Sequence, residues 1–546
     1  MSAGVRQKNA WLHGWAGLLL GWLMFAIFVT GTIAFFRQEV TYWMQPELHD
    51  SDPGEPLEMA RMAIDRLEHI APDAREWQIE LPSEREPQLS VSWEADGAEA
   101  DSASSAFAAD RARAEEAAAQ ANARGGRPRD PGVAVDPATG AIIHPRETAG
   151  GDFLYHFHYQ LHFMSRGSGM LLVGLVTLAM FIAILSGIVT HKKIFKDFFT
   201  FRRRKGQRSW LDAHNAAAVF ALPFHLMITF SGLLLIGGTL LPFSGQERNR
   251  ERQGEMEQQA PTDLAAGSSL PLSKILHTAQ REWSVPVGRL SFDRRANTVE
   301  LSSQRNDSLF LRPGGGPGRN LTFDGTDGTL LEREDNLASD GIDRTNRAIR
   351  ALHLGRFADW QLRWLYFVAG IGGTVMVATG LVLWSVKRAA KRRDALIPIG
   401  QRLAEILNIG AVAGLNLAIA TYFWANRLVP AGTPNRAELE IRLFFIAWTV
   451  TYLHAAARKP QVAWVEQLMV GGGLFALLPI LSFATGSLWL PSAVASGNWI
   501  VAGFDAVCLL TATVMFCAAR FITRGSERDN VAQDFPIVDR SLVPAE

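Results

Sequence analysis

The chain has 546 residues, of which 48% are hydrophobic and 20% charged, and its formal net charge at neutral pH is zero. That length would fit three or four ordinary soluble domains, but the apolar residues are gathered into runs of about 20, long enough to cross a bilayer. The composition therefore excludes a purely soluble protein. The zero net charge is a sum of opposed local biases and identifies no partner.

Eight apolar runs predict an all-α integral membrane bundle of about eight transmembrane helices. The first run is too long for the core of a signal peptide and lacks an A-x-A cleavage site, so we expect it to be retained as a span. The predicted spans are 13–36, 168–190, 212–240, 363–385, 402–424, 440–457, 462–484 and 498–521.

Lysine and arginine placement predicts the orientation of these spans. The segment between the second and third spans, HKKIFKDFFTFRRRKGQRSW, has eight basic residues and one acid. Basic stretches also follow the fourth, sixth and eighth spans, with VKRAAKRRD as one example. All these ends lie on one side of the membrane, which we expect to be the cytoplasm. Both termini are then cytoplasmic, including a tail at 522–546.

Two long segments, 37–160 and 241–355, are predicted to face the opposite, outer side of the membrane as small α+β modules. Each has a helical stretch followed by alternating strands, and each ends in a hairpin pattern, VDPATGAI in the first and FDGTDGTL in the second. The first also contains an Ala- and Arg-rich insertion, 98–130, which we expect to be disordered or loosely helical.

The unit of span, outer module and span occurs twice in the same orientation, which predicts a tandem parallel repeat. The first and third spans both place a glycine 18 residues after a histidine, as His13 to Gly31 and His214 to Gly232. The second and fourth spans are both preceded by a Leu-His pair, which ends in His162 and in His353. The repeat divides the chain into 1–36, 37–160, 161–240, 241–355 and 356–390, with four further spans at 400–521.

The repeat places four histidines at two matched depths. His13 and His214 begin their spans at the cytoplasmic side, and His162 and His353 stand at the outer side. Neutral imidazole is a ligand of iron, and helical bundles hold such cofactors between facing helices. We therefore predict two haem irons, each held by one pair. The only cysteines, Cys508 and Cys517, form no C-x-x-C-H motif, so the haem would be b-type.

Three more histidines are candidates near these pairs. His191 is an alternative cytoplasmic ligand, although its repeat counterpart is Trp384. His225 lies mid-span, and Met24 is its counterpart in the other repeat. A His/Met iron site is one alternative there, but we expect His225 to be a hydrogen-bonding partner inside the bundle or a relay. His158 lies one helical turn before His162 and is expected to flank the outer site. Since His162 and His191 are about 43 Å apart along a straight helix, the two haems would be far apart. His156 is expected beside His158 at the outer site. The remaining histidines are interpreted as ordinary residues: His49, His69, His144, His277 and His454.

Several dense motifs in this order resemble the PepSY-associated transmembrane helix family, in its long iron-regulated membrane protein branch. They are WLHGWAGLLLGWLMFAIFVTGTIAFFRQEV, FHYQLHF, LSGIVTHKKIFKDFFTF, RSWLDAHNAAAVFALPFHLMITFSG and LHLGRF, and together they cover about residues 10–390. VAVDPATGAII resembles the end of a PepSY module. The resemblance implies a bacterial inner-membrane protein of iron and siderophore uptake. Some members are b-haem reductases of periplasmic ferric siderophores.

The expected function is electron transfer to a ferric siderophore, because hard oxygen ligands hold Fe(III) far better than Fe(II). The sequence has no dinucleotide-binding fingerprint and no P-loop, so a cytoplasmic reductase or a membrane quinol must supply the electrons. The expected surroundings are lipid and other iron-uptake components, with no nucleic acid. Two alternatives stay open: a siderophore or iron transporter, and a haem-free scaffold whose outer modules bind peptides.

Overall fold

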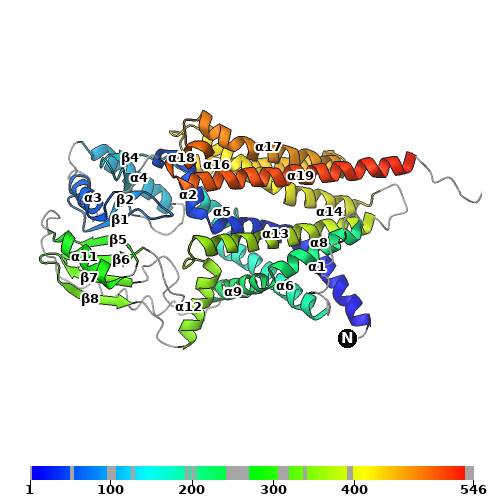
Figure 1. The fold of residues 1–546 in the computed structure, drawn as a ribbon, viewed down its shortest axis with the longest axis horizontal. Helices are drawn as coiled ribbons and strands as arrows, with labels where there is room; N and C mark the ends of the chain where they lie inside the picture. The colour runs from blue at the N-terminus through cyan, green and yellow to red at the C-terminus, as the bar shows by residue number, and fades with distance from the viewer. Residues whose placement is uncertain are drawn as a thin grey trace, which may run out of the picture.

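In the computed structural model the chain forms a long helical bundle with a β-sheet domain at one end (Figure 1). We call this end the sheet end and the opposite end, where the N-terminus lies, the far end (Figure 1). The structure describes residues 3–49, 54–94, 106–123, 130–190, 206–240, 270–283, 285–304, 319–335, 341–389 and 397–534, together with residues 195, 198 and 202.

The helices of the two sequence repeats form one bundle. It contains α1 (Ala3–Ala34), α6 (Arg166–Thr190), α8 (Gln207–Phe220), α9 (Leu222–Leu240) and α13 (Trp360–Ala389). Helix α1 packs against α6 and α13, α8 packs against α13, and α9 packs against α6. Elements that are far apart in the sequence therefore face each other along the bundle.

The third predicted span is broken near its middle. Helices α8 and α9 meet at an angle of 69°. Pro223 stands in the first turn of α9, and a proline has no N–H and clashes with the carbonyl of the fourth residue before it, which is Val219. A straight helix therefore cannot continue from α8 into α9.

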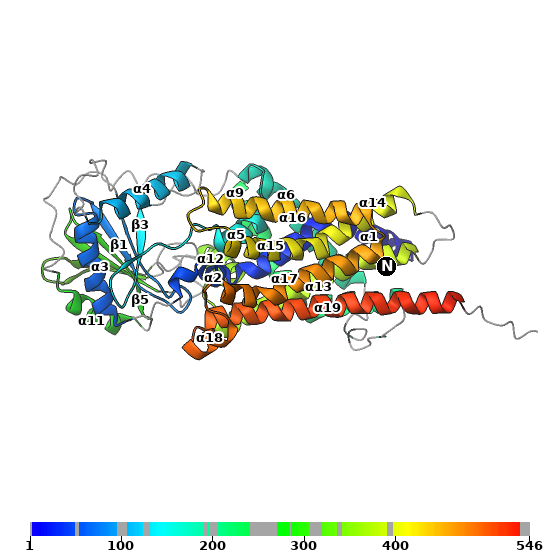
Figure 2. The same cartoon turned by 90° about the horizontal axis from the view of Figure 1, so that it is seen from above.

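The C-terminal helices form a second layer over α1 and α13 (Figures 1 and 2). A long rod is built from α14 (Ile399–Ile409), the π-helical turn η4 (Gly410–Gly414) and α15 (Leu415–Leu428). It is followed by α16 (Arg436–Ala457), α17 (Pro460–Ala484), the short α18 (Leu490–Ser496) and α19 (Trp499–Asp534). Helix α19 thus runs into the predicted tail at 522–546.

Among the described residues, six helices are long and apolar enough to span a membrane, and the α8–α9 pair makes a seventh if it is one span. The protein is therefore a predominantly helical, multi-pass membrane protein. The predicted span 440–457 lies in α16, which is not among these six helices. Four of the first seven residues of α16, RAELEIR, are charged.

Short helices connect the bundle to the sheet. They are α2 (Arg37–Met44), the 3₁₀ turn η1 (Pro46–Leu48), α5 (Gly150–Gln160) and α12 (Gly341–Leu354). Helix α5 packs against α1, and α12 packs against α9. Each connecting helix that follows a set of strands is thus held by the first helix of its own repeat.

The strands of the two repeats join into one sheet rather than two separate modules. The first repeat supplies β1 (Glu76–Glu80), β2 (Leu89–Trp93), β3 (Gly132–Val135) and β4 (Ile142–Ile143). The second supplies β5 (Val287–Asp293), β6 (Thr298–Ser303), β7 (Arg319–Asp324) and β8 (Leu330–Asp335). The strand order is β4-β3-β2-β1-β5-β6-β7-β8. Antiparallel pairing of β1 with β5 sets Trp77 opposite Phe292 and Ile79 opposite Leu290.

The two halves share one hydrophobic core, which explains why they do not separate. Side chains from both, including Trp93 and Phe323, are fully buried in it. Helix α3 (Pro56–Ile70) of the first half packs against α11 (Leu272–Glu282) of the second. Separating the halves would expose this apolar surface and leave the backbone edges of β1 and β5 unpaired.

Part of the insertion at 98–130 is helical, which is one of the two forms expected for it. Residues Ala108–Ala123 form helix α4, which packs near β3. Arg111 is 2% exposed and forms ion pairs with Asp73 at 2.6 Å and with Glu115 at 2.8 Å. This buried, doubly paired guanidinium holds the helix against the sheet domain, a tertiary contact that the low hydrophobicity of the segment does not indicate.

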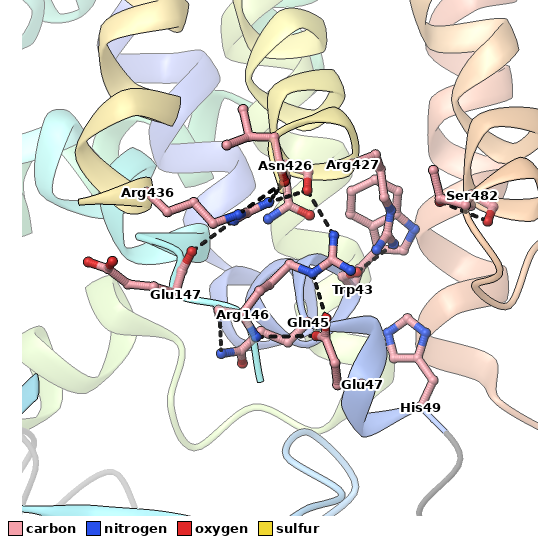
Figure 3. A network of polar contacts seen from close by, with 12 residues as sticks. Trp43, Gln45, Glu47, His49, Arg146, Glu147, Asn426, Arg427, Arg436 and Ser482 are labelled. Atoms are coloured by element: carbon pink, nitrogen blue, oxygen red, sulfur yellow. Dashed lines mark hydrogen bonds and ion pairs between the residues drawn. The ribbon is translucent and has the colours of Figure 1, made fainter. Parts of the chain in front are cut away.

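A buried polar network fixes the C-terminal helices to the connection between α1 and the sheet (Figure 3). At its centre, Arg436 and Glu440 form an ion pair, and both are fully buried. Arg146 bonds both Glu47, at 2.8 Å, and the carbonyl oxygen of Asn426, at 2.9 Å. Since these groups belong to three separate parts of the chain, the network sets the position of the second layer at the sheet end.

Candidate functional site: two histidine pairs

The histidine pair at the far end is the one predicted from the sequence. His13 of α1 and His214 of α8 have ring centroids 6.3 Å apart, with the ring planes at 71°. Nδ1 of His214 lies 2.8 Å from the carbonyl oxygen of Met376 in α13. A carbonyl oxygen only accepts, so Nδ1 carries the hydrogen and Nε2 has the lone pair. We call this the far-end pair.

The second pair lies at the sheet end and consists of His158 of α5 and His353 of α12. Their ring centroids are 6.5 Å apart, with the ring planes at 37°. Nδ1 of His158 donates to the carbonyl oxygen of Ile27, at 2.8 Å. Nδ1 of His353 lies 2.8 Å from the hydroxyl of Ser231. We call these two residues the sheet-end pair.

The hydrogen bonds determine the tautomer of both rings in the sheet-end pair. The Ser231 hydroxyl donates its hydrogen to the carbonyl oxygen of Met227, at 2.6 Å, so it accepts from Nδ1 of His353. His158 has the same tautomer, because Ile27 offers only a carbonyl oxygen. In both rings Nε2 is therefore the nitrogen with a lone pair for a metal ion.

The spacing within each pair matches two imidazoles on one metal ion. Two nitrogens, each about 2 Å from a shared ion and each about 1 Å from its own ring centre, put the centroids about 6 Å apart. Both pairs have this spacing. Within the described residues there is no group of three or more His, Cys, Asp and Glu side chains suited to one metal ion, so the candidate sites are these histidine pairs.

Glycines make room for the sheet-end pair at the two positions that the repeat predicts. A Cβ atom on Gly31 would lie 2.5 Å from Cε1 of His158, and one on Gly232 would lie 3.1 Å from Cε1 of His353. In the far-end pair, a Cβ on Gly380 would lie 3.2 Å from Cε1 of His214. At 2.5 Å, a side chain on residue 31 would overlap the His158 ring where it now lies. The position of this ring therefore requires glycine at residue 31.

Burial keeps the sheet-end histidines neutral. It lowers the pKa of His353 to about 3, with a further lowering from nearby His158, and it also lowers the pKa of His158. The rings are therefore uncharged at neutral pH, the form in which imidazole binds a metal ion.

The structure puts His158, rather than His162, beside His353. Helix α5 ends at Gln160, and Leu161 has a positive φ of 61°, so the chain turns before it reaches His162. The ring of His162 stacks on Phe445 of α16, with centroids 5.2 Å apart and planes at 22°. His353 lies inside α12 and His158 lies inside α5, so these two residues are structural equivalents. His162 lies beyond the end of α5, in a different environment.

His225 lies between the levels of the two pairs. It is 1% exposed, and its ring centroid is 5.9 Å from that of Phe28. Phe28 follows Ile27, whose carbonyl oxygen accepts from His158 of the sheet-end pair. On the other side, a Cβ on Gly373 would contact His225, and Gly373 lies one turn before Met376, which bonds His214 of the far-end pair. The ring nitrogens of His225 face the backbone of α8 and α13 without a hydrogen bond of normal geometry.

The other candidate, His191, lies outside the described residues.

Comparison with known proteins identifies the family of the chain. A family model described as the PepSY-associated TM region matches residues 10–387, which is 378 of the 546 residues. The chain therefore belongs to this family, and both histidine pairs lie inside the matched range. An uncharacterized protein of Pseudomonas aeruginosa is 29% identical to it over 309 residues, which is 53% of this chain and 75% of that protein. Helices α14 to α19 lie outside the family match.

Proposed function

We propose that this member of the PepSY-associated transmembrane family is a b-haem electron-transfer protein of the bacterial inner membrane that reduces ferric siderophores in the periplasm. The observation that carries the proposal is the second histidine pair. Two pairs with nearly the same ring spacing occur at two levels of one bundle, and each combines residues from the two sequence repeats. A single close pair has an ordinary packing explanation; two related pairs favour two related sites.

The residues of the chain fit the group at the sheet end. His158 and His353 would hold it through Nε2, while Ile27 and Ser231 keep the opposite ring nitrogens in place. Such hydrogen bonds orient the ligand and raise its basicity. His13 and His214 would hold the second group in the same way. When bound, a haem with two histidine ligands carries single electrons and has no open position for oxygen.

The two histidine pairs lie closer together along the bundle than the distance of about 43 Å that separates His162 from His191 along a straight helix. Ile27, which bonds the sheet-end pair, is 14 residues from His13 in the same helix, or about 21 Å at 1.5 Å per residue. His225 and Phe28 fill part of the space between. Their role in the proposal is to keep water out of this region and to provide aromatic contact between the levels.

The sheet domain is the proposed place where the ferric siderophore approaches. Strand β4 leads within seven residues into α5, which carries His158, and α12 carries His353 in the second repeat. The sheet would thus face the periplasm and present the substrate above the sheet-end pair. Each ferric ion takes up one electron, and the resulting Fe(II) is held weakly by hard oxygen ligands. The donor would be a cytoplasmic reductase or a membrane quinol.

The test uses purified full-length protein that has been reduced and then mixed with a ferric siderophore without oxygen. We expect fast reoxidation of the protein and release of ferrous iron, which a ferrous chelator traps. His353→Ala is expected to abolish this reaction, while His277→Ala in helix α11 of the sheet domain is the matched control. If the reduced protein is stable beside ferric hydroxamates and ferric catecholates alike, the proposed substrate is wrong.

A further inference from the structure

A large cavity lies between the bundle of the two sequence repeats and the C-terminal helices. Its volume is 1560 Å³. The walls come from α1, α2, α13, α15, α17 and α19, and at the sheet end from loops that include Ser83 and Gln304. The residues of the two histidine pairs do not line it. This space is therefore distinct from the sites described above.

The cavity is a long slot parallel to the helices. Its α13 wall runs from Trp360 to Thr374, 14 residues or about 21 Å, and its α19 wall runs from Trp499 to Thr511, 12 residues or about 18 Å. Trp360, Ile371 and Trp499 line the slot and yet are 58%, 40% and 69% exposed. Within the described part of the chain, the slot is thus open sideways between α13 and α19, toward the position of the bilayer.

The sheet end of the slot contains an unpartnered donor on the α13 side. Arg363 is 6% exposed and forms an ion pair with Glu39. Arg85 binds the same carboxylate with two hydrogen bonds, at 2.9 and 3.0 Å. Nε of Arg363 has no hydrogen-bond partner in the structure. A buried N–H without a partner costs free energy, so a ligand oxygen that accepts this hydrogen would be stabilised here.

An unpartnered acceptor lies on the other side of the slot, close to the start of α19. His49 is 6% exposed, and its Nε2 donates to the carbonyl oxygen of Tyr42, at 2.9 Å. Its Nδ1, which must then have the lone pair, has no partner. Burial lowers the pKa of His49 to about 4, so this nitrogen stays an acceptor at neutral pH. Asn498, at the start of α19, contacts the His49 backbone.

Aromatic rings also line the slot, on the two helices next to these polar groups. They are Trp360, Trp364 and Phe367 on the α13 wall and Trp499 and Phe504 on the α19 wall. Deeper in the slot the walls are mostly apolar, with Ile371, Phe475 and Val507 among them. The lining thus fits a flat ring with oxygen substituents at the sheet end and a long apolar chain below it.

We propose that this slot binds an isoprenoid quinol, with its ring at the sheet end and its tail along α13 and α19. A quinol hydroxyl donates to His49 Nδ1 and its oxygens accept from Arg363 Nε, so one molecule supplies both missing partners. A phospholipid fits less well, because Glu39 already neutralises one of the two guanidiniums and a phosphate diester has no hydrogen to donate to His49.

The position of the slot also suits a partner of the sheet-end pair. Thr32 and Ile33 of α1 line the slot, while Ile27 and Gly31 of the same helix contact His158. One helix therefore separates the bound ring from the histidine pair. That the quinol serves as an electron donor rests on the proposed function, whereas its binding does not.

The test is photolabelling of the full-length protein in nanodiscs of defined phospholipid with a short-chain azidoquinol, and competition by unlabelled decylubiquinol. We expect saturable labelling of peptides from α13 and α19. Ile371→Trp, which fills the slot, should reduce specific labelling at least about tenfold, and His49→Phe should weaken competition about tenfold through the loss of one hydrogen bond. Ile446→Trp on α16, where Ile446 is 59% exposed outside the slot, should change neither.

Labelling that does not saturate, or that is equal in the Ile371→Trp protein, would overturn the proposal. Competition by phospholipid but not by decylubiquinol would also overturn it and assign the slot to lipid. Haem content measured on the same samples separates the two proposals. A haem-loaded protein without specific quinol labelling refutes only the slot, and a haem-free protein that binds quinol refutes only the proposed function.

Discussion

The contact between Gly31 and His158 permits a test of the sheet-end site that leaves all ligands in place. In Gly31→Ala, the new Cβ would lie 2.5 Å from Cε1 of His158, whereas ordinary contact begins at 3.4 Å. The ring must therefore move by about 0.9 Å, several times the tolerance of about 0.2 Å for a metal ligand. Overpacking of this kind costs about 1–3 kcal/mol, against a gain of at most about 1 kcal/mol for alanine over glycine in a helix.

We expect Gly31→Ala to fold and to lose the sheet-end haem, since the displaced part is one side chain. The assay is the pyridine haemochrome ratio with a reduced-minus-oxidised spectrum, which should fall from about two haems per chain to about one. Gly187→Ala is the control, because a Cβ there meets nothing within 4 Å, and it should keep both haems. A Gly31→Ala protein with two haems and an unchanged spectrum would refute the assignment of His158.

Further variants separate the roles of neighbouring residues. His158→Ala should remove one haem, whereas His162→Ala should keep both, as haemochrome analysis would show. Ser231→Ala removes the hydrogen bond that raises the basicity of His353, so a potentiometric titration should find a higher midpoint potential for one haem. In haem-free protein, the lowered pKa of His353, about 3 against 6.5 in the unfolded chain, means that the unfolded state binds the extra proton between these values. Thermal stability should therefore fall as the pH decreases from about 6.5 toward 3, and less steeply in His353→Gln.

Much of the bundle could be predicted from hydropathy and repeat spacing. The apolar runs identify membrane helices, and the equal spacing of His13 to Gly31 and His214 to Gly232 identifies the far-end pair and the glycines of the sheet-end pair. The apolar residues of 440–457 predicted a span there, but they gave no sign that Arg436 and Glu440, at the start of α16, form a buried ion pair.

The choice between His158 and His162 could not be made from spacing. Both repeats have a Leu-His pair, but the first lies after the end of α5 and the second inside α12. Only the helix end at Gln160 tells them apart, and neither a proline nor a glycine marks it.

Contacts between distant parts of the chain explain the remaining differences. Local patterns predicted the strands, but the pairing of β1 with β5 joins segments about 210 residues apart and has no sequence signature of its own. Helix α4 depends on the pairing of Arg111 with Asp73, 38 residues earlier. The slot between α13 and α19 exists only because the second layer packs as it does.

The measurement that tests the central claim most directly is the optical and electron paramagnetic resonance spectrum of the purified wild-type protein from haem-replete cells. Two histidine pairs predict about two b haems per chain, both low-spin with two nitrogen ligands and both reduced by dithionite. A colourless protein, or a single high-spin haem, would contradict the assignment of the two pairs as haem sites.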